Sequence, residues 1–169
     1  MKLMKTRIAA ALSGIVFAGV SMASAQAAES AEYAISLAKA NTITEAALKC
    51  ARAQNLKPMA IAVLDSGGHL ISFAREDAAT FLRYNIATGK AWGALALHMD
   101  SAAYVDMAEK RPAFFATLSE MSGGRMIPSP GGVVVRNAEG RVIGAVGMTG
   151  DAGEKDEACV KEGMKAAGY

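Results

Sequence analysis

The chain has 169 residues, a formal net charge of +2 at pH 7 and a mean hydropathy of +0.21. Its 52% hydrophobic and 20% charged residues are typical of a globular protein and exclude a disordered chain. Two histidines are too few to supply by themselves the three or four protein ligands of a typical zinc site.

The first 27 residues have the pattern of a secretory signal peptide. A basic start is followed by an apolar run at 8–20 and by two Ala-x-Ala cleavage candidates at 23–27. A membrane anchor is the alternative, although the apolar run is short for a spanning helix. We therefore expect a single domain at 28–169 that is periplasmic or secreted.

Removal of this segment changes the charge of the chain. The segment contains three of the 18 basic residues, Lys2, Lys5 and Arg7, and none of the 16 acidic residues. The mature chain therefore has 15 basic and 16 acidic residues, and its net charge is near −1. A nearly neutral domain has no electrostatic reason to bind nucleic acid. The mature part also contains no apolar stretch long enough to span a bilayer.

A helix is predicted over residues 37–54, where small and apolar residues recur at helical spacing. Two starts compete, because Ser36 can cap the helix and Thr42 with Glu45 can form a later capping box. A strand at 59–65 follows.

The residues at 66–68 are typical of a tight turn, and they predict a hairpin in which this strand is followed by a second strand at 69–75. A long helix is predicted at 81–99, with a face of small residues that allows close approach of a neighbour. A shorter helix at 101–110 ends before Pro112.

Residues 114–130 are interpreted as a loop that contains one short strand at most. A second hairpin follows, with strands at 133–135 and 142–148, and the chain ends in an amphipathic helix at 153–167. Glycines recur on the last strand, which indicates close approach by a helix, a subunit or a ligand. Helices before, between and after two hairpins predict an α+β layered domain with a largely antiparallel sheet.

Cys50 and Cys159 lie on the first and last predicted helices. In an exported protein they are able to form a disulfide. The alternative, two buried free thiols, stays open because the sequence does not supply the Cα separation that a disulfide requires.

The common catalytic motifs are absent: the sequence has no G-x-S-x-G, H-E-x-x-H, P-loop or C-x-x-C pattern. Enzymatic turnover therefore stays open, and a binding function is favoured. Glycine pairs offer backbone N–H groups for anions, and Arg125 after one pair suits carboxylate or phosphate. Ordinary turn geometry is the alternative for these glycines.

The two histidines of the chain are candidate ligands or proton carriers. His69 follows the first turn, and His98 ends the long helix, where it is a candidate iron ligand. Surface exposure for His69 and a helix-dipole or packing role for His98 are the alternatives. Four acidic residues lie at the start of the last helix, where they interact favourably with the positive end of the helix dipole. Iron binding is the alternative role for these residues, which are Asp151, Glu154, Asp156 and Glu157.

The order and spacing of short blocks resemble the GlcG/HbpS (DUF336) family of haem-binding and haem-degradation-associated proteins. The same domain is found at the C-terminus of PduO-type cobalamin adenosyltransferases. The match spans residues 35–168, with blocks at 63–70, 75–77, 90–92 (Lys90-Ala91-Trp92), 130–133, 142–150 and 156–157.

The resemblance implies a profilin-like sandwich with a central antiparallel sheet of about five strands and the terminal helices on one face. It also implies homo-oligomers, often octamers, with non-covalent haem in grooves near subunit contacts. Many members carry a threonine after the Lys-Ala-aromatic triplet, where this chain has Gly93. The candidate haem site comprises His69 and His98 for iron, Lys90 and Arg125 for the propionates, and the glycine pair Gly131 and Gly132.

We therefore expect an exported haem-binding protein that sequesters or senses haem or assists its degradation. One alternative is a protein that binds a small hydroxy or keto acid, or assists an enzyme acting on one. The other is a structural oligomer without a ligand.

Overall fold

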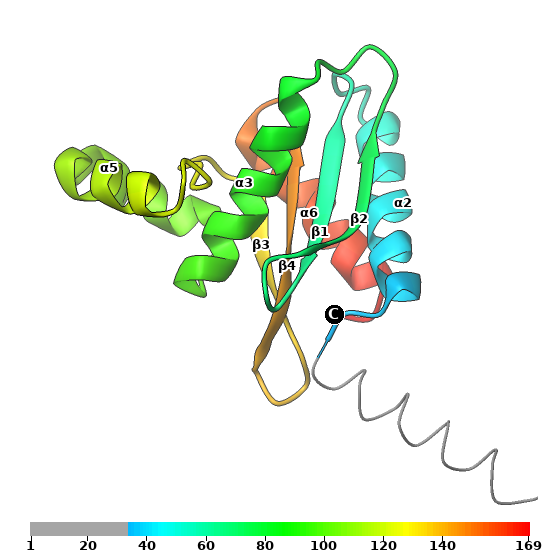
Figure 1. Ribbon diagram of the computed structural model, residues 1–169. Helices are drawn as coiled ribbons and strands as arrows, with labels where there is room; N and C mark the ends of the chain where they lie inside the picture. The colour runs from blue at the N-terminus through cyan, green and yellow to red at the C-terminus, as the bar shows by residue number, and fades with distance from the viewer. Residues whose placement is uncertain (1–33) are drawn as a thin grey trace, which may run out of the picture.

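The computed structural model describes residues 34–169, so the predicted signal peptide lies outside the described residues. Its centre is an antiparallel sheet in the order β2-β1-β4-β3 (Figure 1). The strands are β1 Ala60–Asp65, β2 Leu70–Arg75, β3 Gly132–Arg136 and β4 Val142–Thr149. The expected α+β class and both hairpins are confirmed.

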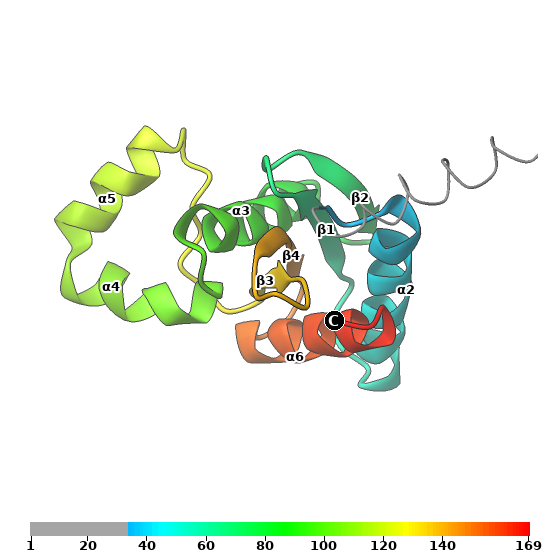
Figure 2. The same ribbon diagram turned by 90° about the horizontal axis from the view of Figure 1, so that it is seen from below.

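Helices cover both faces of this sheet. The terminal helices, α2 (Leu37–Ala53) and α6 (Gly153–Ala166), pack together on one face, and α3 (Leu82–Leu97) lies on the other (Figure 2). Placement of the terminal helices on one face, which the family resemblance implied, is confirmed. Ser36 starts α2, since its hydroxyl accepts a hydrogen bond from the Lys39 N–H at 3.3 Å.

Within the described residues the sheet has four strands, one fewer than the expected number of about five. The segment 114–130, which was interpreted as a loop with one short strand at most, instead begins within helix α5, Pro112–Met121. The N–H group at the first position of a helix has no hydrogen-bond partner inside the helix. Proline, which has no N–H, is therefore well suited to this position, and Pro112 starts α5. Phe115 then packs on Tyr104 and Met126 in a small separate core.

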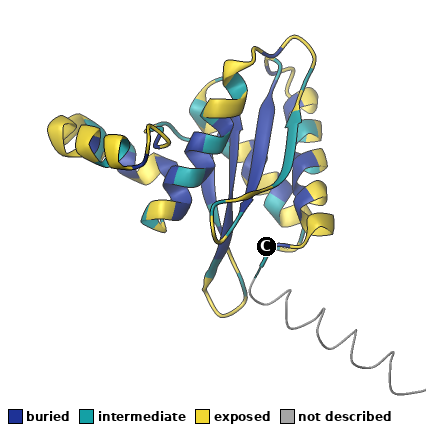
Figure 3. Cartoon of the chain, in the orientation of Figure 1, coloured by how far each residue is buried: buried dark blue, intermediate teal, exposed yellow. Residues whose placement is uncertain are grey.

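The preceding segment forms a short 3-10 helix, Ser101–Tyr104, and helix α4, Val105–Lys110. The pair α4 and α5 extends from the side of the sandwich (Figure 2), and much of its surface is exposed (Figure 3). None of the helices within residues 34–169 is long and apolar enough to cross a membrane.

The close approach indicated by the glycines of β4 is made by a helix. A Cβ atom added at Gly147 would lie 2.0 Å from the Ala87 carbonyl oxygen and 2.7 Å from the Ala91 nitrogen of α3. The absence of a side chain therefore lets α3 lie directly on the sheet.

Cys50 and Cys159 form a disulfide between α2 and α6, with their Cα atoms 5.4 Å apart. The two cysteines are therefore not free thiols. They are able to meet because both helices lie on the same face of the sheet. The main core lies between these helices and the sheet, and it includes Ile43, Val63 and Val160.

Candidate ligand-binding groove

A groove of about 320 Å³ lies between α3, the start of β2 and the loop that follows α5. Its wall on α3 is formed by Tyr84, Thr88 and Trp92, which are spaced four residues apart and therefore share one helix face. The other residues that line it are Leu64, Gly68, Leu70, Asn85, Gly89, Gly123, Gly124 and Arg125.

Trp92 is held between the first hairpin turn and Arg125. The Arg125 guanidinium carbon lies 4.2 Å from the centre of a Trp92 ring, within the range of a cation–π interaction. On the turn, a Cβ atom at Gly68 would lie 3.1 Å from Trp92 Nε1, and Gly68 has φ +80°. Glycine therefore permits both the turn and its contact with the indole.

Arg125 is positioned by the end of α5. Its Nε donates to the Ser122 carbonyl at 2.7 Å, and its backbone N–H donates to the Ser122 hydroxyl at 3.2 Å. The N–H groups of Gly123 and Gly124 donate to the Glu120 and Ser119 carbonyls. Because these N–H groups are used within the helix end, the guanidinium is the anion-binding group that this loop offers.

The groove combines one cation with aromatic and apolar walls. Leu64 is buried, whereas Leu70 and Tyr84 are 45% and 44% exposed. The Tyr84 ring packs edge to face against Phe73, with their centres 5.1 Å apart. This set of groups suits a molecule that has both an apolar surface and a carboxylate.

His69 does not line the groove. Its side chain is 82% exposed, and its Nδ1 lies 3.3 Å from Asp65 Oδ1. The same carboxylate oxygen accepts hydrogen bonds from the Gly67 and His69 N–H groups, both at 2.8 Å. The imidazole is thus held over the hairpin turn, next to the groove-lining Gly68.

His98 ends α3 in the left-handed conformation, with φ 53°. Its side chain is exposed, and its carbonyl accepts a hydrogen bond from Arg136 Nη2 at 2.9 Å. It does not line the groove either, so no histidine of residues 34–169 is among its lining residues.

Lys90 lies in the interior of the protein. Its ammonium is 3.1 Å from Asp156 Oδ2 and 3.1 Å from the Met148 carbonyl, and the two side chains are 3% and 0% exposed. Desolvation lowers the pKa of Lys90 and raises that of Asp156, while their mutual attraction opposes both shifts. The interior ion pair therefore replaces the propionate contact that we expected for Lys90, and Asp156 is not part of an exposed acidic patch.

Gly131 and Gly132 lie beside this ion pair and not in the groove. A Cβ at Gly132 would lie 2.2 Å from the Lys90 carbonyl oxygen, and one at Gly131 would lie 3.0 Å from Lys90 Nζ. The Gly132 N–H donates to the Ser101 hydroxyl at 2.7 Å. Protein atoms fill the space next to both glycines, so packing of α3 against β3 accounts for them.

Gly93, the position at which many relatives carry threonine, faces a tyrosine. A Cβ at Gly93 would lie 2.3 Å from the Tyr104 hydroxyl oxygen, which donates a hydrogen bond to the Ile127 carbonyl at 3.1 Å. Tyr104 is fully buried, and burial raises its pKa.

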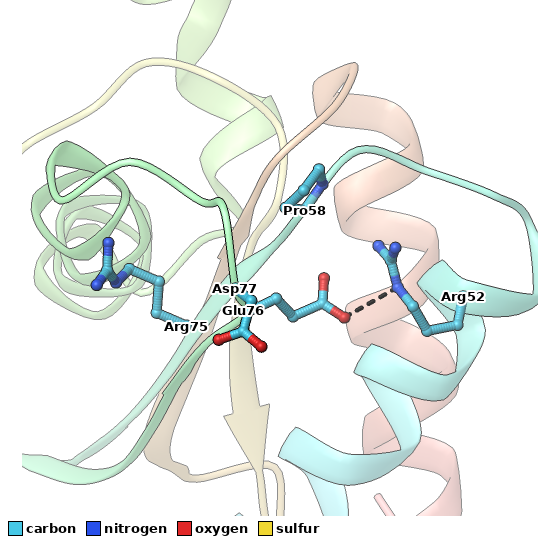
Figure 4. A pocket seen from close by; sticks show the side chains of 5 residues that line it. All are labelled: Arg52, Pro58, Arg75, Glu76 and Asp77. Carbon is cyan, nitrogen blue, oxygen red and sulfur yellow. Dashed lines mark ion pairs between the residues drawn. The ribbon is translucent and has the colours of Figure 1, made fainter.

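A second hollow, of about 410 Å³, lies at the other end of β2 and is lined by charged side chains (Figure 4). Arg52 Nε is 2.9 Å from Glu76 Oε1, and the other Glu76 oxygen accepts the Met59 N–H at 2.7 Å. Arg75 donates to the Ala79 carbonyl and is directed away from Arg52. Arg52 and Glu76 pair with each other and Arg75 with the backbone, so this hollow is the weaker candidate.

Of the six residues of the candidate haem site, the structure places only Arg125 in the groove and His69 beside it, and the glycine pair before Arg125 also lines the groove. Tyr84, Asn85 and Thr88 were missed as single residues, and Trp92 was named only as part of the resemblance. The signal that identifies the aromatic wall is the spacing of four along α3. The described residues contain no group of three or more His, Cys, Asp or Glu side chains that could hold a metal ion.

Comparison with known proteins identifies the class of this α+β domain. Residues 35–165 match the family model of haem degrading protein HbpS-like, so the chain belongs to this family. No functionally curated protein matches the chain.

Several solved structures share the fold. Protein ORFY of Klebsiella pneumoniae, a DUF336 protein, is 28% identical over 79% of this chain and 90% of its own, with a TM-score of 0.72. The PduOC:heme complex is 23% identical over 79% and 94%, with a TM-score of 0.70. A double mutant of HbpS from Streptomyces reticuli is 21% identical over 98% and 100%, with a TM-score of 0.71.

Proposed function

We propose that this protein is an exported haem-binding protein whose groove on α3 holds haem without a covalent bond. The observation that carries the proposal is the stack of Arg125 on Trp92 in a groove that is lined by both apolar and polar residues. Membership of the HbpS-like family and likeness to a haem complex support it.

In this proposal the porphyrin lies against Trp92, Leu64 and Leu70, and Arg125 pairs with a propionate. Burial of a flat apolar ring against these side chains supplies most of the affinity. The guanidinium adds orientation and a charge-assisted hydrogen bond. Haem, when bound, supplies an iron centre for sequestration, sensing or slow oxidation of the porphyrin.

The test is a hemin titration of residues 28–169, followed by the Soret band and by tryptophan fluorescence. The chain has a single tryptophan, Trp92 in the groove, so bound haem should quench nearly all of the emission. Saturable binding without this quenching would place haem elsewhere. No saturable binding at all would refute the proposed function.

Replacement of the groove arginine has a matched control in the same chain. Arg125→Gln should weaken hemin binding about fivefold, which is ~1 kcal/mol for an exposed ion pair. Arg111 lies 4.3 Å over the Phe114 ring of the α4–α5 arm, outside the groove, so Arg111→Gln should leave affinity unchanged. Equal affinities for all three proteins would remove Arg125 from the site.

Export and self-association are the other parts of the proposal. Export rests on the signal pattern of residues 1–27, and mass spectrometry of the protein from cell fractions tests it by the mature N-terminus. A homo-oligomer is supported by large apolar side chains that stay exposed, such as Phe81 at 85% and Met121 at 80%. Light scattering of the mature chain should therefore report a mass above that of one subunit.

A further inference from the structure

We propose that Tyr84 is the side chain of the groove that binds the haem iron, through its phenolate oxygen. This inference rests on the proposed function, since it assigns the iron ligand within the same groove. It follows from which groove-lining atoms are able to donate an electron pair to ferric iron.

Most polar groups of the groove are unsuitable or already used. The Trp92 N–H and the Arg125 guanidinium are hydrogen-bond donors with no lone pair to offer. The Thr88 hydroxyl donates to the Tyr84 carbonyl at 2.7 Å and keeps its lone pairs, but it is a neutral alcohol oxygen and a weaker donor to ferric iron than a phenolate. The Asn85 amide is neutral and competes poorly with an anionic oxygen for a ferric ion.

Imidazole is a common ligand of haem iron, but neither histidine of residues 34–169 lines the groove. His69 is held over the hairpin turn by Asp65, and His98 lies at the far end of α3. Within one chain, neither imidazole competes with a groove residue for iron in this site.

Tyr84 is the remaining donor, and it is free to act. Its hydroxyl has no hydrogen-bond partner within residues 34–169, and its side chain is 44% exposed. Edge-to-face packing on Phe73 fixes the ring. Tyrosinate is an established type of axial ligand for ferric haem.

The position of Tyr84 along α3 separates it from the arginine of the groove. Tyr84 and Trp92 are two helix turns apart on one face, roughly 12 Å along the axis at about 1.5 Å per residue. Arg125 stacks on Trp92, so iron bound by Tyr84 and a carboxylate bound by Arg125 would be held at separate points of the same groove.

The binding step is a ligand exchange without oxidation or reduction. The phenol O–H bond breaks and its proton goes to solvent, while the oxygen forms a bond to ferric iron. The water or hydroxide that free ferric haem carries leaves as the new bond forms.

The experiment compares hemin with iron-free protoporphyrin IX on the mature wild-type chain and on Tyr84→Phe, using Trp92 quenching for affinity. Tyr84→Phe should lower hemin affinity about tenfold or more and leave porphyrin affinity within about twofold. The ferric absorption and electron paramagnetic resonance spectra should change from a high-spin phenolate type in the wild type. Tyr169→Phe is the control, because Tyr169 packs under Lys39 away from the groove.

The outcomes separate this inference from the proposed function. Hemin binding with spectra and affinity unchanged in Tyr84→Phe would overturn the inference and leave haem binding intact. Equal loss of hemin and porphyrin affinity would show that Tyr84 only packs against the ring, which also overturns it. If the wild type binds neither molecule, the proposed function itself fails.

Discussion

Reduction of the Cys50–Cys159 disulfide should strongly destabilise the domain. The cysteines are 109 positions apart, and closure of a loop of that length corresponds to about 4.7 kcal/mol of chain entropy at 25 °C. For a domain of this size the loss corresponds to a fall in Tm of about 10 to 20 °C.

The reduced wild type is the appropriate comparison because it keeps both sulfur atoms. Cys159 is fully buried, so its replacement would add a packing cost to the entropic one. Urea unfolding of the oxidised and reduced protein, followed by far-UV circular dichroism, gives the two free energies of unfolding. The oxidised protein should also show the smaller m-value, since its unfolded chain is more compact.

A double variant, Cys50→Ala with Cys159→Ala, is the control for the reductant. Its stability should lie at or below that of the reduced wild type and should not respond to reductant. A difference below about 1 kcal/mol between the oxidised and reduced wild type would refute the loop-closure argument.

Three substitutions test other features of the fold by urea unfolding. Lys90→Met leaves the fully buried Asp156 without its cationic partner and should lower the free energy of unfolding by about 3–5 kcal/mol. A second replacement, Asp156→Leu, should restore part of this loss, because it removes the buried charge but also the carboxylate that accepts the Asp151 N–H. A single variant as stable as wild type contradicts this prediction. Gly147→Ala places a Cβ against the Ala87 carbonyl and should lower the free energy of unfolding by about 1–3 kcal/mol, because it displaces α3. An unchanged free energy of unfolding would contradict this prediction. Ala78 has φ 66°, and Ala78→Gly should stabilise by about 0.5–1 kcal/mol; a loss of stability would mean that its methyl group packs favourably.

Local sequence patterns were sufficient for most elements of the fold. The glycine-containing turn at 66–68 predicted the first hairpin, and the structure pairs β1 with β2 in that way. The spacing of apolar residues predicted α2, α3 and α6 to within a few residues of their observed ends. These signals are local because backbone conformation and side-chain periodicity are set over a few residues.

The main error in the predicted fold arose at a proline, because proline is found both just after the end of a helix and at the start of one. Pro112 was interpreted as the end of a helix, but it also begins the next one, and α5 follows it. Proline is tolerated at the first position of a helix and excluded from its interior, so the residue alone does not distinguish the two cases. The contact of Phe115 with Tyr104, which stabilises α5, is a tertiary one.

In the candidate site, too, local features followed from the sequence and long-range contacts followed only from the tertiary structure. The sequence by itself determined the turn chemistry at Gly67-Gly68, the amphipathic helices and the family to which the chain belongs. The tertiary structure decided that Lys90 pairs with Asp156 in the interior, and that Trp92 lies between the first turn and Arg125. Burial and ion pairing depend on residues 66 positions apart in the chain, and only the packing of α3 against the sheet brings them together.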